Sequence, residues 1–127
     1  MNGTSDPLLP FDGGFVGRKR TREAGRGSVL STHDATDYWR NLNGISSPPS
    51  SQLLPDINRH DRSRVFITRY TGGTDATQVW LYEIKGGGHT EPSLTEHYRR
   101  LYKTIVGQQN RDIEMAEEVW KFFQSHH

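Results

Sequence analysis

The sequence contains no cysteine, which excludes disulfide bonds and zinc sites built from thiolates. It also lacks a long hydrophobic run, because no stretch approaches the ~20 apolar residues of a membrane-spanning helix. Strong charge of one sign is missing as well, since the formal net charge is +1. A chain so close to neutrality is not expected to steer a polyanion from a distance. We therefore expect neither nucleic acid nor membrane among its partners.

Apolar residues are also scarce. They make up 31% of the 127 residues, and adding the 13 glycines brings the share to about 41%, below the roughly 45–50% typical of soluble domains. The length suits one domain with a modest core. We predict a single domain over residues 1–127, with a core that is either incompletely ordered or completed by something outside the chain.

Two stretches alternate in the manner of β-strands. Residues 64–70 and 77–84 are rich in β-branched and aromatic residues, with successive side chains directed to opposite faces. The glycine-containing residues 71–76 between them favour a hairpin with a loose loop. We therefore predict an adjacent antiparallel pair.

Three stretches predict helices, at residues 31–43, 94–105 and 112–124. The first begins with Ser31 and Asp34 at the spacing of a capping box and ends before Gly44. Trp39 is expected in the core, with stacking against a ligand as the alternative. Each helix is expected to bury one apolar stripe, formed by Ala35, Tyr38, Trp39 and Leu42; by Leu94, Tyr98, Leu101, Tyr102 and Ile105; and by Ile113, Ala116, Val119, Trp120 and Phe123.

The remaining segments predict loops. Residues 1–14 are expected to contain turns and no strand before Asp6, and the serine- and proline-rich residues 45–63 predict a surface linker within the domain. Residues 15–30 predict a basic loop, either an anion-binding patch or a solvated surface segment. Its cations are Arg18, Lys19, Arg20, Arg22 and Arg26.

A histidine follows the second predicted strand on a run of three glycines, Gly86-Gly87-Gly88-His89. Open α/β sheets place ligand crevices at the carboxyl ends of their strands. Glycines there let the backbone turn sharply and leave room for a substrate or a second loop. Because the ordinary pKa of histidine lies near neutrality, His89 is a candidate proton acceptor and donor. The alternative is a surface loop histidine without a catalytic role.

An aspartate near the start of the chain supplies a candidate partner for this histidine. Asp6 lies on a turn stiffened by Pro7, where its carboxylate could accept an imidazole N–H and stabilise imidazolium. The alternative is an ordinary Asx turn. In α/β-hydrolases the nucleophile, the acid and the histidine follow one another along the chain, and Asp6 precedes His89. No G-x-S-x-G elbow occurs, and neither Ser28 nor Ser46 lies at a predicted strand-to-helix turn.

The segment Gly3-Thr4-Ser5-Asp6-Pro7-Leu8-Leu9-Pro10-Phe11 resembles the acid-bearing loop of α/β-hydrolases. Within that fold it is similar to the polyhydroxybutyrate depolymerase/feruloyl esterase group of secreted serine esterases, related to carbohydrate esterase family 1. Gly86-Gly87-Gly88-His89-Thr90 resembles the histidine loop of this group. Similar too are Lys19-Arg20 running into Val29-Leu30-Ser31, Tyr38-Trp39, Asn43-Gly44 and Glu118-Val119-Trp120-Lys121-Phe122-Phe123.

The resemblance covers nearly the whole chain but only the C-terminal part of the family's domain. It implies an α/β fold, made of the last strands of an α/β-hydrolase with flanking helices and an incomplete sheet. It also implies Asp6 as the triad acid and His89 as the triad base, with the serine, the oxyanion loop and the N-terminal part of the domain upstream. The expected substrates are feruloyl or acetyl esters on polysaccharide, or hydroxyalkanoate esters.

Other implications concern the mouth of the site and the location of the protein. Many members carry a tryptophan after the His-Thr pair, where this chain has Glu91, so we expect Glu91 to change the shape and charge of the substrate mouth. No cofactor is expected. The family is largely exported, which predicts an extracellular or periplasmic protein, although the first residues lack the charged and apolar regions of a signal peptide.

Different chemistry also remains open. His89, Glu91 and His97 are close enough in sequence to supply metal ligands, but their spacing matches no helical H-E-x-x-H pattern and Pro92 interrupts the segment. A non-catalytic module that binds an anionic partner through residues 18–26, or a degenerate remnant of an enzyme, would account for the missing nucleophile. An incomplete sheet also predicts exposed apolar faces and self-association.

Overall fold

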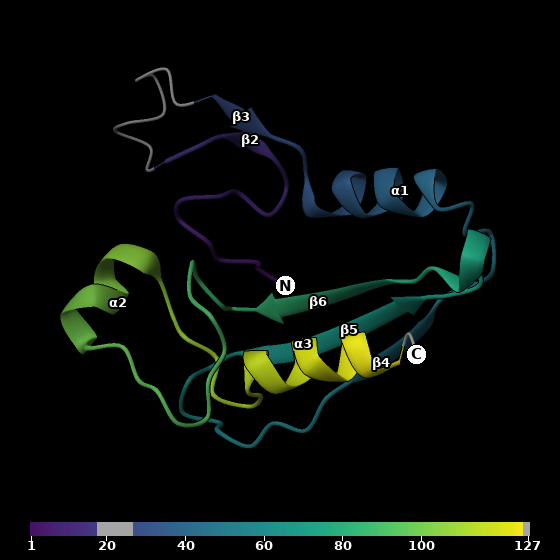
Figure 1. Ribbon diagram of the computed structural model, residues 1–127. Coiled ribbons are helices and arrows are strands. Elements are labelled where there is room, and N and C mark those ends of the chain that lie inside the picture. Colours follow the sequence, from purple (N-terminus) through teal and green to yellow (C-terminus); the bar gives the residue numbers. More distant parts are fainter. Residues whose placement is uncertain (18–26, 126–127) are drawn as a thin grey trace.

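A computed structural model describes residues 1–17 and 27–125. Its centre is a four-stranded sheet in the order β1-β6-β5-β4 (Figure 1). The sheet is mixed, because β1 runs parallel to β6 whereas the other neighbours pair antiparallel. Its strands are β1 (Asn2–Gly3), β4 (Ser50–Leu53), β5 (Arg64–Tyr70) and β6 (Val79–Lys85).

The predicted hairpin is confirmed. β5 and β6 pair from Arg64↔Lys85 to Tyr70↔Val79, and the connection contains a short 3-10 turn at Thr74–Ala76. Strand alternation places Val65 and Ile67 on one face, where they are 1% and 0% exposed. The pairing therefore supplies both the backbone of the sheet and its best-buried side chains.

The core lies between one face of the sheet and α3 (Met115–Gln124). Val65, Ile67, Tyr82, Ile84 and Ile113 form it, with Leu54 and Trp80 packed at its border. The Tyr82 hydroxyl donates to Glu118 Oε2 at 2.7 Å, and the Trp80 and Phe122 rings meet edge to face at 5.3 Å. On the opposite face Leu81 is buried as well, and α1 (Thr32–Leu42) contacts β6. The sheet is thus covered on both sides of β6.

Helix α1 begins and ends as predicted, but it buries a different face. Asp34 N–H donates to Ser31 Oγ at 2.9 Å, and Gly44 follows the helix with φ 66°. Thr32 and Thr36 are its buried residues, whereas Tyr38, Trp39 and Leu42 are more than half exposed. The prediction of Trp39 in the core is therefore wrong. The apolar stripe of α1 is therefore largely exposed, although Trp39 lines a cavity beside β6.

The apolar stripe of the last helix is also largely uncovered. Ile113 is buried as predicted, but it precedes the helix, and Val119, Trp120 and Phe123 are 41%, 62% and 56% exposed. The helix starts at Met115 rather than at residue 112. Asp112 lies before the helix, where its carboxylate accepts hydrogen bonds from the N–H groups of Ile57 and Asn58.

The helix predicted at residues 94–105 is shorter, as α2 spans only Arg100–Val106. The preceding N–H groups are taken by side chains from elsewhere in the chain. Leu94 N–H donates to Glu114 Oε2 at 3.0 Å, and Tyr98 N–H donates to Gln109 Oε1 at 3.0 Å. These long-range partners replace the helical turn that the apolar spacing had predicted. Leu101, Tyr102 and Ile105 are exposed, so this predicted stripe is wrong as well.

Several short strands were not predicted, because their residues do not alternate between apolar and polar side chains. β1 precedes Asp6, β4 lies inside the predicted linker at residues 45–63, and β2 (Gly14–Phe15) pairs with β3 (Ser28–Val29) at the ends of the predicted basic loop. Main-chain pairing rather than side-chain burial defines β4, whose four residues are all exposed. Membership of the sheet in an α/β-hydrolase domain stays a prediction. Within the described ranges, no helix has the length and apolarity needed to cross a membrane.

The hydrogen bond from Tyr82 to Glu118 of α3 predicts that the folded protein loses stability at alkaline pH. Burial and then the hydrogen bond to Glu118 raise the pKa of the Tyr82 phenol above its ordinary value of about 10. The contribution of Tyr82 to the free energy of unfolding is therefore fully present below pH 10. It declines above pH 10, where the phenol ionises in the unfolded chain first, by at most about 1.4 kcal/mol per pH unit. Tyr82→Phe should cost about 1 kcal/mol at pH 8, and the cost should shrink between pH 10 and 11.5.

Urea denaturation of the wild-type protein and of Tyr82→Phe, from pH 8 to 11.5, measures this difference in the free energy of unfolding. Tyr38→Phe is the matched control, because Tyr38 is 58% exposed. A difference between wild type and Tyr82→Phe that stays constant from pH 8 to 11.5 would contradict the interpretation.

Candidate active site

Asp6 sits on a tight turn just beyond β1. One carboxylate oxygen, Oδ1, accepts the N–H groups of Leu8 and Leu9 at 2.7 and 2.9 Å. Pro7 fixes the intervening backbone. The Asx turn considered from the sequence is therefore present, and it leaves the second oxygen, Oδ2, for another partner.

His89 lies on the loop that follows β6. Gly86 turns the chain with φ 78°, and the loop is then held from two sides. On one side, Thr4 N–H donates to the Ile84 carbonyl and Ser5 N–H to the Gly87 carbonyl, at 3.0 and 2.9 Å. The other side is held by residues 106–108, because Gly88 N–H donates to the Gln108 carbonyl and His89 N–H to the Val106 carbonyl, at 2.7 and 2.6 Å.

Glycine is required where these segments meet. A Cβ atom on Gly3 would lie 2.4 Å from the carbonyl oxygens of Gly87 and Gly88. A Cβ atom on Gly88 would lie 2.3 Å from the Val106 carbonyl oxygen and 2.5 Å from the Gly107 Cα. The obstructing atoms are backbone, which cannot swing aside as a flexible side chain does. The glycines thus set how closely the Asp6 and His89 loops approach.

The two loops bring the predicted residues together. His89 Nδ1 lies 2.8 Å from Asp6 Oδ2, and the Asp6 side chain is 9% exposed whereas that of His89 is 45% exposed. An ionised carboxylate only accepts, so Nδ1 carries the proton in this contact. Within residues 1–17 and 27–125, the opposite ring nitrogen, Nε2, makes no hydrogen bond.

A cleft of about 430 Å³ opens beside His89. Glu91 lines it together with Tyr98 and Tyr102, whose rings pack at 4.9 Å. The Tyr98 hydroxyl donates to Glu91 Oε2 at 2.6 Å, and this bond raises the pKa of Tyr98 to about 12. Glu91 therefore lines the cleft beside His89 with one oxygen already bonded, and its role at a substrate mouth stays a prediction. The two tyrosines were missed, because their spacing was interpreted as the buried stripe of a helix.

The cleft supplies no nucleophile from the described part of the chain. No serine and no cysteine lines it, and the Thr90 hydroxyl donates to the Gln108 carbonyl at 3.0 Å. Ser28 lies in β3 and Ser46 after α1, and both are exposed away from the cleft lining. The described residues thus present an acid and a base without the group that a base of this kind would activate.

Two other predicted groups have different outcomes. The His97 Nε2 atom lies 2.7 Å from Arg111 Nη2, so His97 is engaged away from His89 and Glu91. Within the described ranges, no three histidine or acidic side chains come together as a possible metal site. The basic residues 18–26 lie outside the residues that the structure describes.

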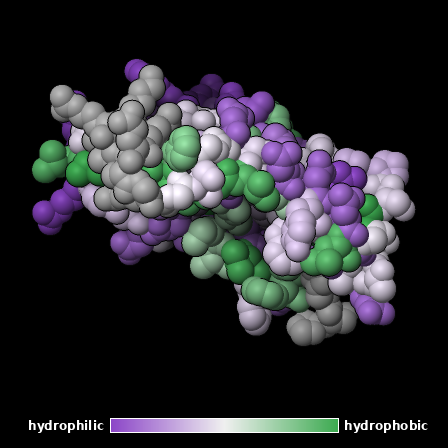
Figure 2. Space-filling view, turned by 90° about the horizontal axis from the view of Figure 1, so that it is seen from above, coloured by the Kyte–Doolittle hydropathy of each residue, from purple (hydrophilic) through white to green (hydrophobic). Residues whose placement is uncertain are grey.

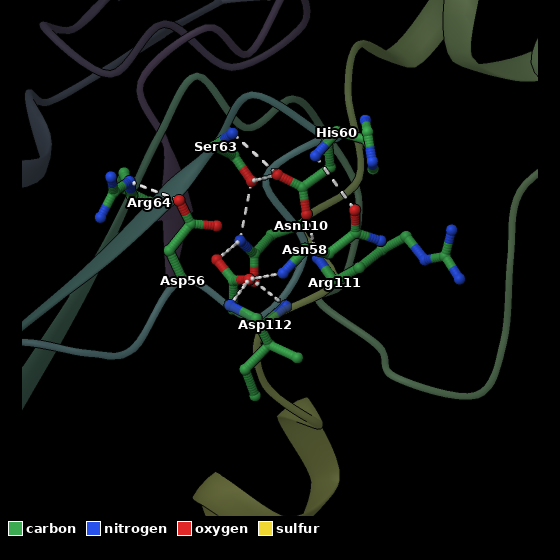
Figure 3. Close-up of polar contacts among 10 residues, drawn as sticks. Asp56, Asn58, His60, Ser63, Arg64, Asn110, Arg111 and Asp112 are labelled. Atoms are coloured by element: carbon green, nitrogen blue, oxygen red, sulfur yellow. Dashed lines mark hydrogen bonds and ion pairs between the residues drawn. The ribbon is translucent and has the colours of Figure 1, made fainter.

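A buried polar cluster that the sequence did not predict joins residues 110–112 to residues 61–63 (Figure 3). Asn110 Nδ2 donates to Ser63 Oγ and Asp112 Oδ2 at 2.7 and 2.9 Å, and Ser63 Oγ donates to Asp61 Oδ1 at 2.7 Å. Arg111 N–H completes the cluster through Asp61 Oδ2 at 2.7 Å. The cluster fixes residues 110–112 to residues 61–63, next to the segment that binds the Gly88 and His89 amides. The bonds from Asn110 to Ser63 and from Arg111 to Asp61 join segments about 50 residues apart, so local spacing does not indicate that the two halves of the cluster meet.

Comparison of the chain with protein-family models, with curated proteins and with solved structures finds no match in any of the three.

The glycine contact gives a direct test of the site geometry. Gly88→Ala should lower the free energy of unfolding by about 1–3 kcal/mol, because the new methyl group meets backbone on the Val106 side. It should also shift the NMR signals of the His89 ring as the loop moves away from Asp6. Gln124→Ala, at an exposed position of α3, is the control and should change stability by no more than about 0.5 kcal/mol. Equal stability of the two variants would refute the close-packing argument.

Proposed function

We propose that Asp6 and His89 are the acid and the base of a serine esterase, whose nucleophilic serine lies upstream of this chain. The observation that carries the proposal is the 2.8 Å contact between a largely buried carboxylate and a half-exposed imidazole. In the neutral imidazole such a contact favours the proton on Nδ1, so that Nε2 is the acceptor that a general base requires.

The position of the two residues also supports it. Asp6 follows β1 and His89 follows β6. Because these strands are parallel neighbours, both residues lie just beyond the carboxyl ends of the strands, at one end of the sheet. Ligand crevices of open α/β sheets lie at this end. The acid precedes the histidine along the chain, as in the α/β-hydrolases that the two loops resemble.

The reaction would proceed in two halves. Nε2 accepts the proton of the serine hydroxyl as the serine oxygen attacks the ester carbonyl, and Asp6 stabilises the resulting imidazolium. The imidazolium then gives its proton to the departing alcohol, which leaves an acyl-serine. The same imidazole takes a proton from water as the water attacks the acyl group. The imidazolium then gives this proton to the serine oxygen as the acyl–oxygen bond breaks, which releases the carboxylic acid and the free serine. The proposal places the serine and the oxyanion donors upstream of Met1.

The substrate class comes from the resemblance and from the character of the cleft. Feruloyl or acetyl esters on polysaccharide and hydroxyalkanoate esters are the proposed substrates. Two tyrosines line the cleft and its described lining contains no lysine or arginine, which suits an uncharged ester better than an anionic one. Export, which the resemblance implies, stays a prediction.

The proposal predicts that this chain alone has no triad-dependent activity. A purified preparation should hydrolyse p-nitrophenyl acetate no faster than its His89→Ala variant. His60→Ala is the matched control, because His60 is exposed and does not line the cleft. Robust turnover that His89→Ala abolishes and His60→Ala retains would show that the nucleophile is already in the chain.

The complete protein provides the positive test. The coding DNA upstream of Met1 should contain an in-frame G-x-S-x-G, and the protein expressed from it should hydrolyse p-nitrophenyl acetate and methyl ferulate. His89→Ala should then reduce kcat by roughly 10³-fold or more, while His60→Ala leaves it unchanged. An extended protein that is active but indifferent to His89→Ala would overturn the proposal.

A further inference from the structure

One wall of the His89 cleft is formed by Glu91, Tyr98 and Tyr102, and we call it the Glu91 wall. The Tyr98 hydroxyl donates to Glu91 Oε2, and the two tyrosine rings pack against each other. The view from above shows hydrophobic and hydrophilic side chains next to one another on the surface of the molecule (Figure 2). The Glu91 wall is of this mixed kind, because it joins a carboxylate to two aromatic rings.

A single buried side chain holds the backbone of the Glu91 wall. Gln109 is 3% exposed, and its Oε1 accepts the N–H of Tyr98 at 3.0 Å. Its Nε2 donates to the carbonyls of Glu91 and Glu96 at 3.2 and 3.1 Å. Both N–H donors of the amide and its oxygen are thus used on this one segment. The carboxylate and the phenol are positioned before a ligand arrives, which lowers the entropy cost of binding.

The residues next to Gln109 tie the Glu91 wall to the histidine loop. The Gly88 N–H, directly before His89, donates to the Gln108 carbonyl at 2.7 Å. On the other side of Gln109, the Asn110 carbonyl accepts from the N–H of Ser93 at 3.1 Å. One short stretch of backbone therefore sets the position of the wall relative to the imidazole. Every contact that shapes the wall joins residues that follow β6, so the wall does not depend on an upstream segment.

The Glu91 wall carries a negative charge that no cation neutralises in the described part of the chain. Within residues 1–17 and 27–125, Glu91 belongs to no ion pair, and no lysine or arginine lines the cleft. Arg99, Arg100 and Lys103 are neighbours of the two tyrosines along the chain, but none of them is part of the lining. Asp6 is a second carboxylate in the lining. The ligand that matches this cleft electrostatically is therefore cationic.

The hydrogen-bonding groups of the Glu91 wall narrow the kind of cation. The Tyr98 hydroxyl gives its proton to Glu91 Oε2, so the phenol oxygen is left only to accept. Glu91 Oε1 makes no hydrogen bond within the described ranges and is an acceptor as well. A primary ammonium group has three N–H donors and no acceptor, whereas a quaternary ammonium group has no donor. The faces of the tyrosine rings also attract a cation.

We infer that the Glu91 wall binds a protonated primary amine on the alcohol part of the ester, as an acylated amino sugar carries. The alcohol is the part concerned because its oxygen takes a proton from His89 when it leaves, and His89 and Glu91 line the same cleft. This place in the reaction rests on the proposed function, whereas the binding of the amine does not. A neutral sugar leaves the charge of Glu91 unpaired, so the wall distinguishes amino sugars from neutral ones.

The first experiment measures binding and needs no catalysis. The purified chain is titrated with glucosamine or glucose at about pH 6.5, below the pKa of amino groups, and the ring signals of Tyr98 and Tyr102 are followed by NMR. Glucosamine has an amine where glucose has a hydroxyl. It should bind at least about tenfold more tightly, because a hydrogen bond between charged groups is stronger than one from a hydroxyl. Tetramethylammonium, a cation without an N–H donor, should bind at least about tenfold more weakly than glucosamine.

Variants locate the preference for the amine on the Glu91 wall. Glu91→Gln keeps the shape of the side chain but loses its charge, and it should bind glucosamine and glucose alike. Glu117→Gln is the matched control, because it removes the same charge from an exposed position of α3 outside the cleft, and it should keep the preference. Tyr98→Phe keeps the ring but removes an acceptor, and it should weaken glucosamine binding about three- to tenfold. Equal binding of the two sugars by the unmodified chain, a preference that survives in Glu91→Gln, or tetramethylammonium binding as tight as that of glucosamine would overturn the inference.

The complete protein separates this inference from the esterase proposal. It should hydrolyse glucosamine acetylated on its primary hydroxyl with a kcat/KM at least about tenfold higher than that for glucose acetylated at the same position, and Glu91→Gln should abolish the difference. If p-nitrophenyl acetate is cleaved in a His89-dependent manner but both sugar esters are cleaved equally, the amine site is refuted and the esterase proposal stands. If glucosamine binds at the Glu91 wall but no ester is cleaved, the esterase proposal fails and the amine site stands.

Discussion

The site depends on backbone-to-backbone contact among three loops. Gly3, Gly88 and Gly107 lie where the acid loop, the histidine loop and the end of α2 meet, at separations that leave no space for a Cβ atom. Main-chain contacts of this kind place Asp6 and His89 within hydrogen-bond distance through short stretches of backbone rather than through long side chains. Rigid support is what the proposed proton-transfer pair would need, because small displacements weaken such a pair.

Asp6 shows how one residue satisfies two interpretations of the same sequence. Oδ1 closes an Asx turn and Oδ2 contacts the imidazole, so the structural role and the proposed catalytic role use different oxygens. The turn holds the carboxylate in place independently of His89. The aspartate is therefore oriented before it meets its partner, and the contact orders little more than the imidazole itself.

Local patterns in the sequence predicted the parts of the fold that local forces decide. The hairpin of β5 and β6, the cap at Ser31 and the stop at Gly44 all follow from spacing and propensity. Long-range partners decided the rest, as where Glu114 and Gln109 take the amides that would have started α2 early. Helical spacing found apolar faces on α1 and α3 but not their burial, which depends on what lies opposite. The Asp6–His89 contact was predicted from chain order and resemblance, whereas Tyr98 and Tyr102 depended on a helix boundary that no local signal marks.

β1 and β6 are neighbours in the sheet but lie far apart in sequence, so Asp6 and His89 are synthesised at different times. Asp6 and His89 are 83 residues apart in sequence. At a synthesis rate of about 5–20 residues per second, the aspartate would leave the ribosome roughly 4–17 s before the histidine. During that interval β1 has no partner strand, whereas the Asx turn needs only Asp6 and the Leu8 and Leu9 amides. The contact between Asp6 and His89 can therefore form only after the segment that contains His89 has been synthesised.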